Sequence, residues 1–201
     1  MTSIPAPSRD GAPFPDQPVP EQPRPDAPTG VPGTGPDGPS QVSPADFKAV
    51  FRRHPAGVAV VTFSHGGALF GFTATSVISV SADPPVLTFS IDSTSSSWPA
   101  LAEADTVVIN FLAAAQVDVS ARFATRGIDR FAEGGWSLLT TGEPVLDGNQ
   151  AWVRGRVVQR TAIGRSFLVS VLALEAHQAG ATEPLVYHDR TYHAVGDHTA
   201  L

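Results

Sequence analysis

The chain has no cysteine, one methionine and two tyrosines among its 201 residues. Without cysteine it can have no disulfide framework, no thiolate nucleophile and no zinc site with cysteine ligands. It also has no basic cluster, and its formal net charge is -6. Because nucleic acids and anionic membranes recruit clustered Lys and Arg, neither is expected as a partner.

Long apolar runs are missing as well. No uninterrupted stretch approaches the roughly 20 residues that cross a bilayer as a helix. The N-terminus lacks the basic start and apolar run of a secretory signal, so we expect a cytoplasmic protein. The six histidines show neither the H-x-x-x-H nor the H-E-x-x-H spacing of zinc enzymes, and no metal site is expected.

Proline is abundant but unevenly placed, since 13 of the 19 prolines precede Ala45. Residues 1–42 are rich in Pro, Gly, Ser, Asp and Gln and have almost no aliphatic clusters. Such a segment cannot bury enough apolar surface to offset the entropy of ordering, so a disordered tail is predicted. Residues 43–201 are long enough to form one domain with a sizeable core.

The tail contains one sequence that imitates a nucleotide-binding motif. Residues 33–38 (GTGPDG) satisfy the pattern G-x-G-x-x-G. That pattern indicates dinucleotide binding only between a strand and a helix. Here Pro32 and Pro36 flank and interrupt it and no apolar strand precedes it, so a low-complexity coincidence is favoured.

Short strands dominate the rest of the chain. Ser43, Pro44 and Asp46 predict the start of a helix that ends before Pro55. Shorter helices are predicted at residues 97–101 and 116–124, the second with Val119, Ala121 and Phe123 partly buried. Runs rich in β-branched residues predict strands at residues 57–64, 68–75, 86–91, 106–112, 152–159 and 167–174, and a final hairpin at 185–188 and 192–195. Because strands and helices do not alternate, a mainly β, small antiparallel barrel is expected rather than a doubly wound sheet.

One block stands out chemically. Residues 71–85 (GFTATSVISVSADPP) repeat small hydroxyl side chains and end in a rigid Pro-Pro turn. Hydroxyls and free backbone amides at a strand end can hold a phosphate or the polar edge of a ring. Taken alone, such residues are more often ordinary solvent-facing strand residues.

This block resembles the signature of the flavin reductase family, whose fold is the FMN-binding split β-barrel. Further blocks match the family in order: residues 55–62 (PAGVAVVT), 93–99 (STSSSWP), 110–112 (NFL), 123–124 (FA), 129–131 (DRF), 142–146 (GEPVL) and 184–187 (PLVY). The resemblance covers about residues 47–195. Asp129-Arg130 is interpreted either as part of this pattern or as a simple surface pair.

The resemblance implies four groups of flavin-binding residues. Hydroxyls and amides expected along the isoalloxazine ring and ribityl chain are Thr73, Ala74, Thr75, Ser76, Ser79 and Ser81. Residues expected near the phosphate end are Asp92, Ser93, Ser95, Ser96 and Ser97. Contacts to the ring or ribityl chain are expected from Asn110, Phe111 and Leu112, and Arg122, Phe123 and Ala124 are expected to cover the phosphate, with Arg122 as the cation.

The nicotinamide site departs from the family pattern. Many members carry Gly-Asp-His before the penultimate long strand, where the His is expected to meet the nicotinamide. This chain has Gly164, Arg165 and Ser166 there, and Arg165 is suited to the phosphate of NADPH. Residues 196–198 (GDH) repeat the tripeptide beyond the aligned region and are interpreted as a coincidence.

The resemblance implies an NAD(P)H-dependent flavin reductase. It would transfer a hydride from NADH or NADPH to FMN or FAD and supply reduced flavin to a separate monooxygenase component. A homodimer with flavin near the subunit interface is implied as well. No catalytic side-chain dyad is expected, because the cofactors supply the chemistry. Two alternatives stay open: a flavin carrier or electron-transfer protein of the same fold, and a split-barrel flavin oxidase or oxygenase.

Overall fold

The computed structural model describes residues 41–180 and 182–200. The predicted tail, residues 1–42, therefore lies almost wholly outside the described residues, as does the motif at residues 33–38. The strands are β1 (Ala56–Gly57), β2 (Ala59–His65), β3 (Ala68–Ala74), β4 (Ile78–Ala82), β5 (Pro85–Asp92), β6 (Thr106–Phe111), β7 (Trp136–Leu138), β8 (Pro144–Leu146), β9 (Ala151–Ile163), β10 (Ser166–Gln178), β11 (Leu185–His188) and β12 (Thr191–Ala194). The helices are α1 (Pro44–Arg52), α2 (Trp98–Leu101) and α3 (Val117–Ala124), with 3-10 turns η1 (Ala114–Gln116) and η2 (Asp197–Thr199).

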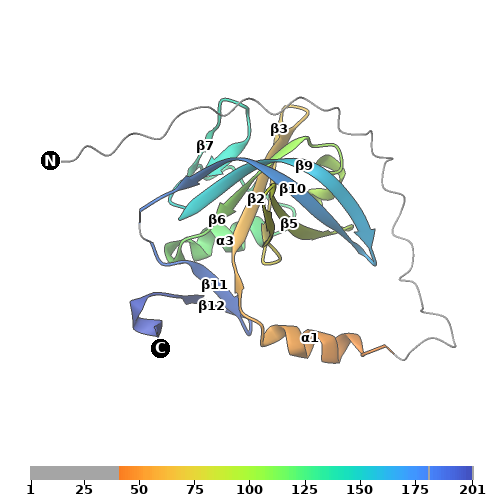
Figure 1. The fold of residues 1–201 in the computed structure, drawn as a ribbon. Helices are drawn as coiled ribbons and strands as arrows, with labels where there is room; N and C mark the ends of the chain where they lie inside the picture. The colour runs from red at the N-terminus through yellow and green to blue at the C-terminus, as the bar shows by residue number, and fades with distance from the viewer. Residues whose placement is uncertain (1–40, 181, 201) are drawn as a thin grey trace, which may run out of the picture.

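Seven antiparallel strands form the main sheet in the order β3-β2-β6-β9-β10-β5-β4. The sheet is strongly curved, with the long strands β9 and β10 sweeping across it (Figure 1). Two register shifts in the β9–β10 pair bend these strands. The curvature brings the two ends of the sheet together, so that the rings of Phe72 on β3 and Phe89 on β5 lie 5.9 Å apart.

The core fills both faces of the central strands. Inside the curved sheet lies a cluster that includes Phe63, Phe89, Val107, Ile109, Val169 and Val171. A second cluster lies beneath α3 and includes Val58, Val60, Leu112, Phe123, Phe131 and Leu185. Strand β2 contributes to the first cluster through Val61 and Phe63 and to the second through Val60, which explains its continuous apolar sequence.

Close packing of β9 on β10 depends on Gly155. A Cβ atom at this position would stand 2.6 Å from the backbone oxygen of Leu172 and would also meet the side chain of Val171. No real side chain tolerates such a contact with backbone, so glycine allows the two strands to approach here.

Helix α1 differs from helices α2 and α3 because it buries none of its residues. Ser43 caps its start: the side-chain oxygen accepts a hydrogen bond from the backbone amide of Asp46 at 3.1 Å. At its other end, the amide of Asp189 donates to the carbonyl of Arg52 at 3.0 Å. Helix α1 therefore extends away from the barrel beside the β11–β12 hairpin (Figure 1).

The predicted mainly β, antiparallel architecture is confirmed, and the predicted strands and helices lie close to their expected positions. Three strands were missed, and β1 and β2 were predicted as one strand. Strand β4 was treated as part of the hydroxyl-rich block, and β7 and β8 have only three residues each, too few to show a period. In α3 the predicted burial of Ala121 is wrong, because Ser120 and Phe123, three residues apart, face the barrel.

Candidate functional site

A cavity of about 250 Å³ lies where β3, β5 and the loop after β5 meet the end of α3. We call it the serine–arginine cavity. Its polar lining consists of Thr73, Ser90, Asp92, Ser95 and Ser96, and two guanidinium groups, Arg126 and Arg130, complete it. Hydroxyl donors facing two cations make a site suited to an anion such as a phosphate.

The loop after β5 is held in shape by the last residue of that strand, Asp92. The carboxylate of Asp92 accepts hydrogen bonds from the Thr94 amide at 2.7 Å and the Thr94 hydroxyl at 2.6 Å. These bonds, aided by the positive charges of Arg165 and Arg126, lower the pKa of Asp92 below its ordinary value. The carboxylate is therefore ionised near neutral pH and fixes the turn that presents Ser95 and Ser96 to the cavity.

Helix α2, which follows this loop, is clamped from two sides. The ring of Trp98 stacks on Phe167 of β10, with centroids 3.6 Å apart. From β9, the guanidinium of Arg160 donates to the carbonyl of Leu101 at 3.0 Å and to that of Ala104. Burial lowers the pKa of Arg160, although the charge of Asp105 opposes this shift. The clamps fix the helix against the barrel and thereby fix the loop that precedes it.

Arg130 joins three segments at the cavity. Its guanidinium donates to the carbonyl of Gly71 at 2.8 Å and to that of Thr125 at 2.8 and 3.0 Å, with a longer contact of 3.4 Å to the Ser97 hydroxyl. Burial lowers the pKa of Arg130, and the nearby charge of Arg126 adds to the shift. Arg130 is thus a structural tie as well as a cavity cation, and the alternative of a simple surface pair with Asp129 is wrong.

Arg122, the expected phosphate cation, does not line this cavity. Its guanidinium forms an ion pair of 2.6 Å with Glu133, and its side chain is 12% exposed. Arg126, which was not among the residues expected from the sequence, lines the cavity instead. The sequence around Arg126 gave no sign of this role. Arg126 lies two residues beyond the end of α3, so the loop orients its side chain and helical spacing does not. Phe123 and Ala124, also expected at the phosphate, do line the cavity.

The residues of the hydroxyl-rich block divide between two places. Thr73 lines the serine–arginine cavity, although its hydroxyl donates to the carbonyl of Ser120 at 2.7 Å. Ala74 is buried in the core and offers no side chain to a ligand. Thr75 and Ser76 line a second hollow, described below. The two remaining predicted residues, Ser79 and Ser81, lie on the edge strand β4 and line neither place.

The expected contact of the Asn110 side chain with flavin is wrong. Asn110 is fully buried, and its amide donates to the Val60 carbonyl at 3.1 Å and the Thr62 hydroxyl at 3.0 Å. Its side-chain oxygen accepts from the amide of Leu146 at 2.9 Å and the side chain of Asn149 at 3.1 Å. All of its hydrogen-bonding capacity is thus used within the fold.

Three further predicted residues are also committed to the fold. Leu112 is fully buried, and Phe111 packs against the inner core cluster. Ser97 is buried, and its hydroxyl donates to the Gly71 carbonyl at 3.3 Å. Their side chains therefore support the site rather than line it.

The predicted nicotinamide residues lie at the turn between β9 and β10. Gly164 has a positive φ of 58°, which a tight turn requires. The amide of Ser93 donates to the carbonyl of Arg165 at 2.9 Å, and Ser166 pairs with Asp92. Gly164, Arg165 and Ser166 are therefore close neighbours of the loop that presents Ser95 and Ser96.

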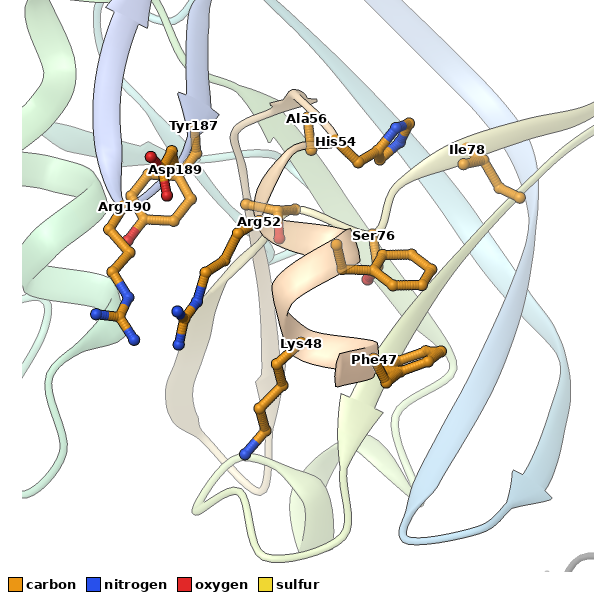
Figure 2. A pocket seen from close by; sticks show the side chains of 12 residues that line it. Phe47, Lys48, Arg52, His54, Ala56, Ser76, Ile78, Tyr187, Asp189 and Arg190 are labelled. Atoms are coloured by element: carbon orange, nitrogen blue, oxygen red, sulfur yellow. The ribbon is translucent and has the colours of Figure 1, made fainter. Parts of the chain in front are cut away.

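A larger hollow of about 600 Å³ lies between α1, the β3–β4 connection and the β11–β12 turn. We call it the α1 groove (Figure 2). It adjoins the serine–arginine cavity where Ser76, which lines the groove, meets Ser90, which lines the cavity. The hydroxyl of Ser76 accepts a hydrogen bond of 2.9 Å from the amide of Ser90 and donates one of 3.3 Å to its carbonyl. The two hollows therefore lie next to each other, on either side of the contact between Ser76 and Ser90.

The described residues lack the features of two other classes of protein. Within residues 41–180 and 182–200, no helix is long and apolar enough to cross a membrane. In the same part of the chain, no three His, Cys, Asp or Glu side chains are grouped so that they could hold a metal ion.

Comparison with known proteins gives a consistent result. Residues 51–196 match the family described as the flavin reductase like domain. An NADH:FMN oxidoreductase of Rhodococcus erythropolis is 44% identical over 153 residues, which cover 74% of this chain and 80% of that protein. HsaB, the reductase subunit of a flavin-dependent monooxygenase of Mycobacterium tuberculosis, is 30% identical over 155 residues, covering 76% and 83%.

A solved structure agrees. The crystal structure of a flavin reductase domain protein from Arthrobacter sp. FB24 superposes with a TM-score of 0.72 at 36% identity, covering 76% of this chain and 95% of that one. The predicted split-barrel fold is confirmed by this likeness. The chain belongs to the flavin reductase-like domain family.

Proposed function

We propose that this protein is an NAD(P)H-dependent flavin reductase that takes a hydride from NADH or NADPH and passes it to FMN, or to FAD. The observation that carries the proposal is the pair of adjoining hollows. One presents serine hydroxyls and two arginines, and the other continues from it along the hydroxyls of Thr75 and Ser76. A molecule with a phosphate at one end and a polar-edged ring at the other matches two such adjoining hollows.

The residues of the cavity fit the phosphate end of a flavin. Ser95 and Ser96 offer hydroxyls, and Arg126 and Arg130 offer the planar guanidinium donors that suit phosphate oxygens. FMN is proposed as the first substrate because its phosphate suits the serine–arginine cavity. The similar Rhodococcus protein is named for FMN and NADH.

Hydride acceptance is chemistry that the bound flavin supplies. The chain's own residues bind and orient it. The phosphate would be held by Ser95, Ser96, Arg126 and Arg130. Thr75 and Ser76 line the adjoining groove, where the ring would lie. Placing two rings in contact needs no side chain that gains or loses a proton, so the site needs no general base.

The proposal extends to partners and organisation. Reduced flavin would be delivered to a separate monooxygenase component, as the name of the similar reductase subunit from Mycobacterium implies for that protein. A cytoplasmic location is proposed, with residues 43–201 as the globular domain, whose first helix is capped by Ser43.

A homodimer is also proposed. Edge strand β4 exposes two large apolar side chains, Ile78 and Val80, which a second copy would cover. Sedimentation velocity should show a dimer that Val80→Asp weakens. A monomer at all concentrations would contradict this part of the proposal.

The experiment that tests the function follows the absorbance of reduced nicotinamide. Purified protein is mixed with NADH or NADPH in turn, and with FMN or FAD in turn. Rapid oxidation that depends on added flavin is expected, with FMN preferred. Tight flavin binding without any oxidation would refute the reductase and favour a flavin carrier. Oxygen uptake that depends on an organic substrate would favour an oxidase or oxygenase.

A further inference from the structure

We propose that a small hollow beyond the serine–arginine cavity seats the adenosine half of FAD, so that the protein accepts FAD as well as FMN. This inference rests on the proposed reductase function and adds a third place along the flavin. The hollow has a volume of about 240 Å³ and lies between β3 and the loop after α3. We call it the Ile128 hollow, after the exposed apolar residue in that loop.

The first observation is the order of the hollows along edge strand β3. Residues 75–76, just beyond the strand, line the α1 groove, residues 72–73 line the serine–arginine cavity, and residues 69–71 line the Ile128 hollow. Because a strand is extended, at about 3.3 Å per residue, this order in sequence is also an order in space. The three hollows thus follow one another as the ring, the phosphates and the adenosine do in FAD.

The second observation is the junction between the cavity and the Ile128 hollow. Ser96 and Arg130 line both of them. The guanidinium of Arg130 is held there by its hydrogen bonds to the carbonyls of Gly71 and Thr125. Within the described residues Nη2 donates to Thr125 alone, which leaves its second N–H for a phosphate oxygen. With Arg126 in the cavity, two cations are available to the two phosphates of FAD.

The third observation is the chemistry of the lining. Ile128 is 48% exposed and the ring of Phe70 is half-buried, so both offer apolar surface to a flat base. Asp129 accepts a hydrogen bond of 2.9 Å from the amide of Phe131 through Oδ1. Within the part of the chain that the structure describes, Oδ2 accepts none and can receive the hydroxyls of a ribose. Apolar surface beside a carboxylate suits a nucleoside and disfavours a further phosphate.

The wall that carries Ile128 is fixed to the barrel by its neighbours. The ring of Phe131 packs edge-on against Phe123 and Trp136, with centroids 5.2 and 5.6 Å away. Ile128 itself belongs to neither core cluster. Its side chain can therefore be replaced while the loop and the fold are kept.

The test compares FMN and FAD as ligands of the full-length protein, by isothermal titration calorimetry without nicotinamide. Ile128→Ser removes the apolar contact and adds no charge. The dissociation constant for FAD should rise about 3- to 10-fold, because the adenosine loses apolar surface to pack against. The dissociation constant for FMN, which has no adenosine, should change by less than about twofold.

Leu138→Ser is the matched control, because Leu138 is 55% exposed and lines none of the three hollows. It should change both dissociation constants by less than about twofold. Unchanged FAD binding in Ile128→Ser, or an equal loss for FMN and FAD, would overturn the inference and leave the reductase intact, as would a parent protein that binds FMN but not FAD. A parent protein that binds both flavins yet oxidises neither NADH nor NADPH would instead refute the proposed function and leave the adenosine site in place.

Discussion

The serine–arginine cavity and the α1 groove adjoin at Ser76 and Ser90, yet the chain builds them in opposite ways. The cavity is made of segments tied to the barrel over long sequence distances. Arg130 reaches back to Gly71, and Arg160 holds the far end of α2. The groove has one wall on a helix that buries nothing, joined to the β11–β12 turn by a hydrogen bond between backbone groups of Asp189 and Arg52.

The difference indicates two kinds of binding. A preorganised cavity loses little freedom when its ligand binds, so it suits the phosphate that must hold the flavin in one place. A groove under an unburied helix can adjust, and it suits a substrate that must enter and leave in each cycle. The predictions below test this contrast.

The largest expected effect concerns a buried carboxylate of the barrel, Glu143. Glu143 is buried, accepts hydrogen bonds from the hydroxyls of Thr106 and Thr141, and forms an ion pair of 2.9 Å with Arg154. Removing Glu143 leaves the charge of Arg154 partly buried without its partner. Glu143→Ala should therefore lower the free energy of unfolding by about 3–5 kcal/mol. Phe47→Ala on α1 should cost less than about 0.5 kcal/mol. Urea unfolding measures the free energy of unfolding of both variants. Equal losses in the two would contradict the contrast between the tightly packed barrel and the unburied helix α1.

The same cluster gives a pH dependence. Burial alone would raise the pKa of Glu143, but the hydrogen bonds from Thr106 and Thr141 and the charge of Arg154 outweigh it and hold the pKa below the ordinary value of 4.5. A lowered pKa stabilises the fold above the unfolded value, and this stabilisation is lost as pH falls through the folded one. The urea midpoint of the parent protein should therefore fall below about pH 4.5. The Glu143→Gln variant should show a shallower fall.

The next effect concerns the cation that the structure places at the cavity. Arg126→Ala should raise the dissociation constant for FMN about 10- to 100-fold, as expected for losing a charge-assisted hydrogen bond worth about 1.5–3 kcal/mol. Arg122→Ala, which loses only the pair with Glu133, should change it by less than about threefold. Flavin fluorescence titration measures both. A larger loss of FMN affinity in Arg122→Ala than in Arg126→Ala would support Arg122, the phosphate cation expected from the sequence.

The smallest effect is at the β9–β10 turn. Arg165 is exposed, so Arg165→Ala should change a KM by no more than about fivefold. If Arg165 meets the phosphate that distinguishes NADPH, the KM for NADPH rises more than the KM for NADH. Equal effects of Arg165→Ala on both KM values would remove this arginine from dinucleotide binding.

Much of the fold follows from local patterns. Ser43 and Pro44 start a helix wherever they stand before such a sequence, and the apolar run of β2 can only be a strand buried on both faces. The hydroxyl-rich block and the serine loop likewise identified the part of the chain that lines the cavity. Strand β4 was not predicted because its five residues, although they alternate between apolar and small polar side chains, have no buried face. Only its pairing with β5 defines it as a strand.

The sequence by itself determined the fold class, the family and the segments that approach the site, because these depend on the chemistry of neighbouring residues. Only the tertiary structure decided which side chains reach the cavity. Asn110 belongs to a family block, yet the register of β6 between β2 and β9 turns it into the core. Arg122 and Arg126 are four residues apart, and the course of the chain beyond α3 directs one to Glu133 and the other to the cavity. Such choices depend on contacts between residues far apart in sequence, which no local pattern encodes.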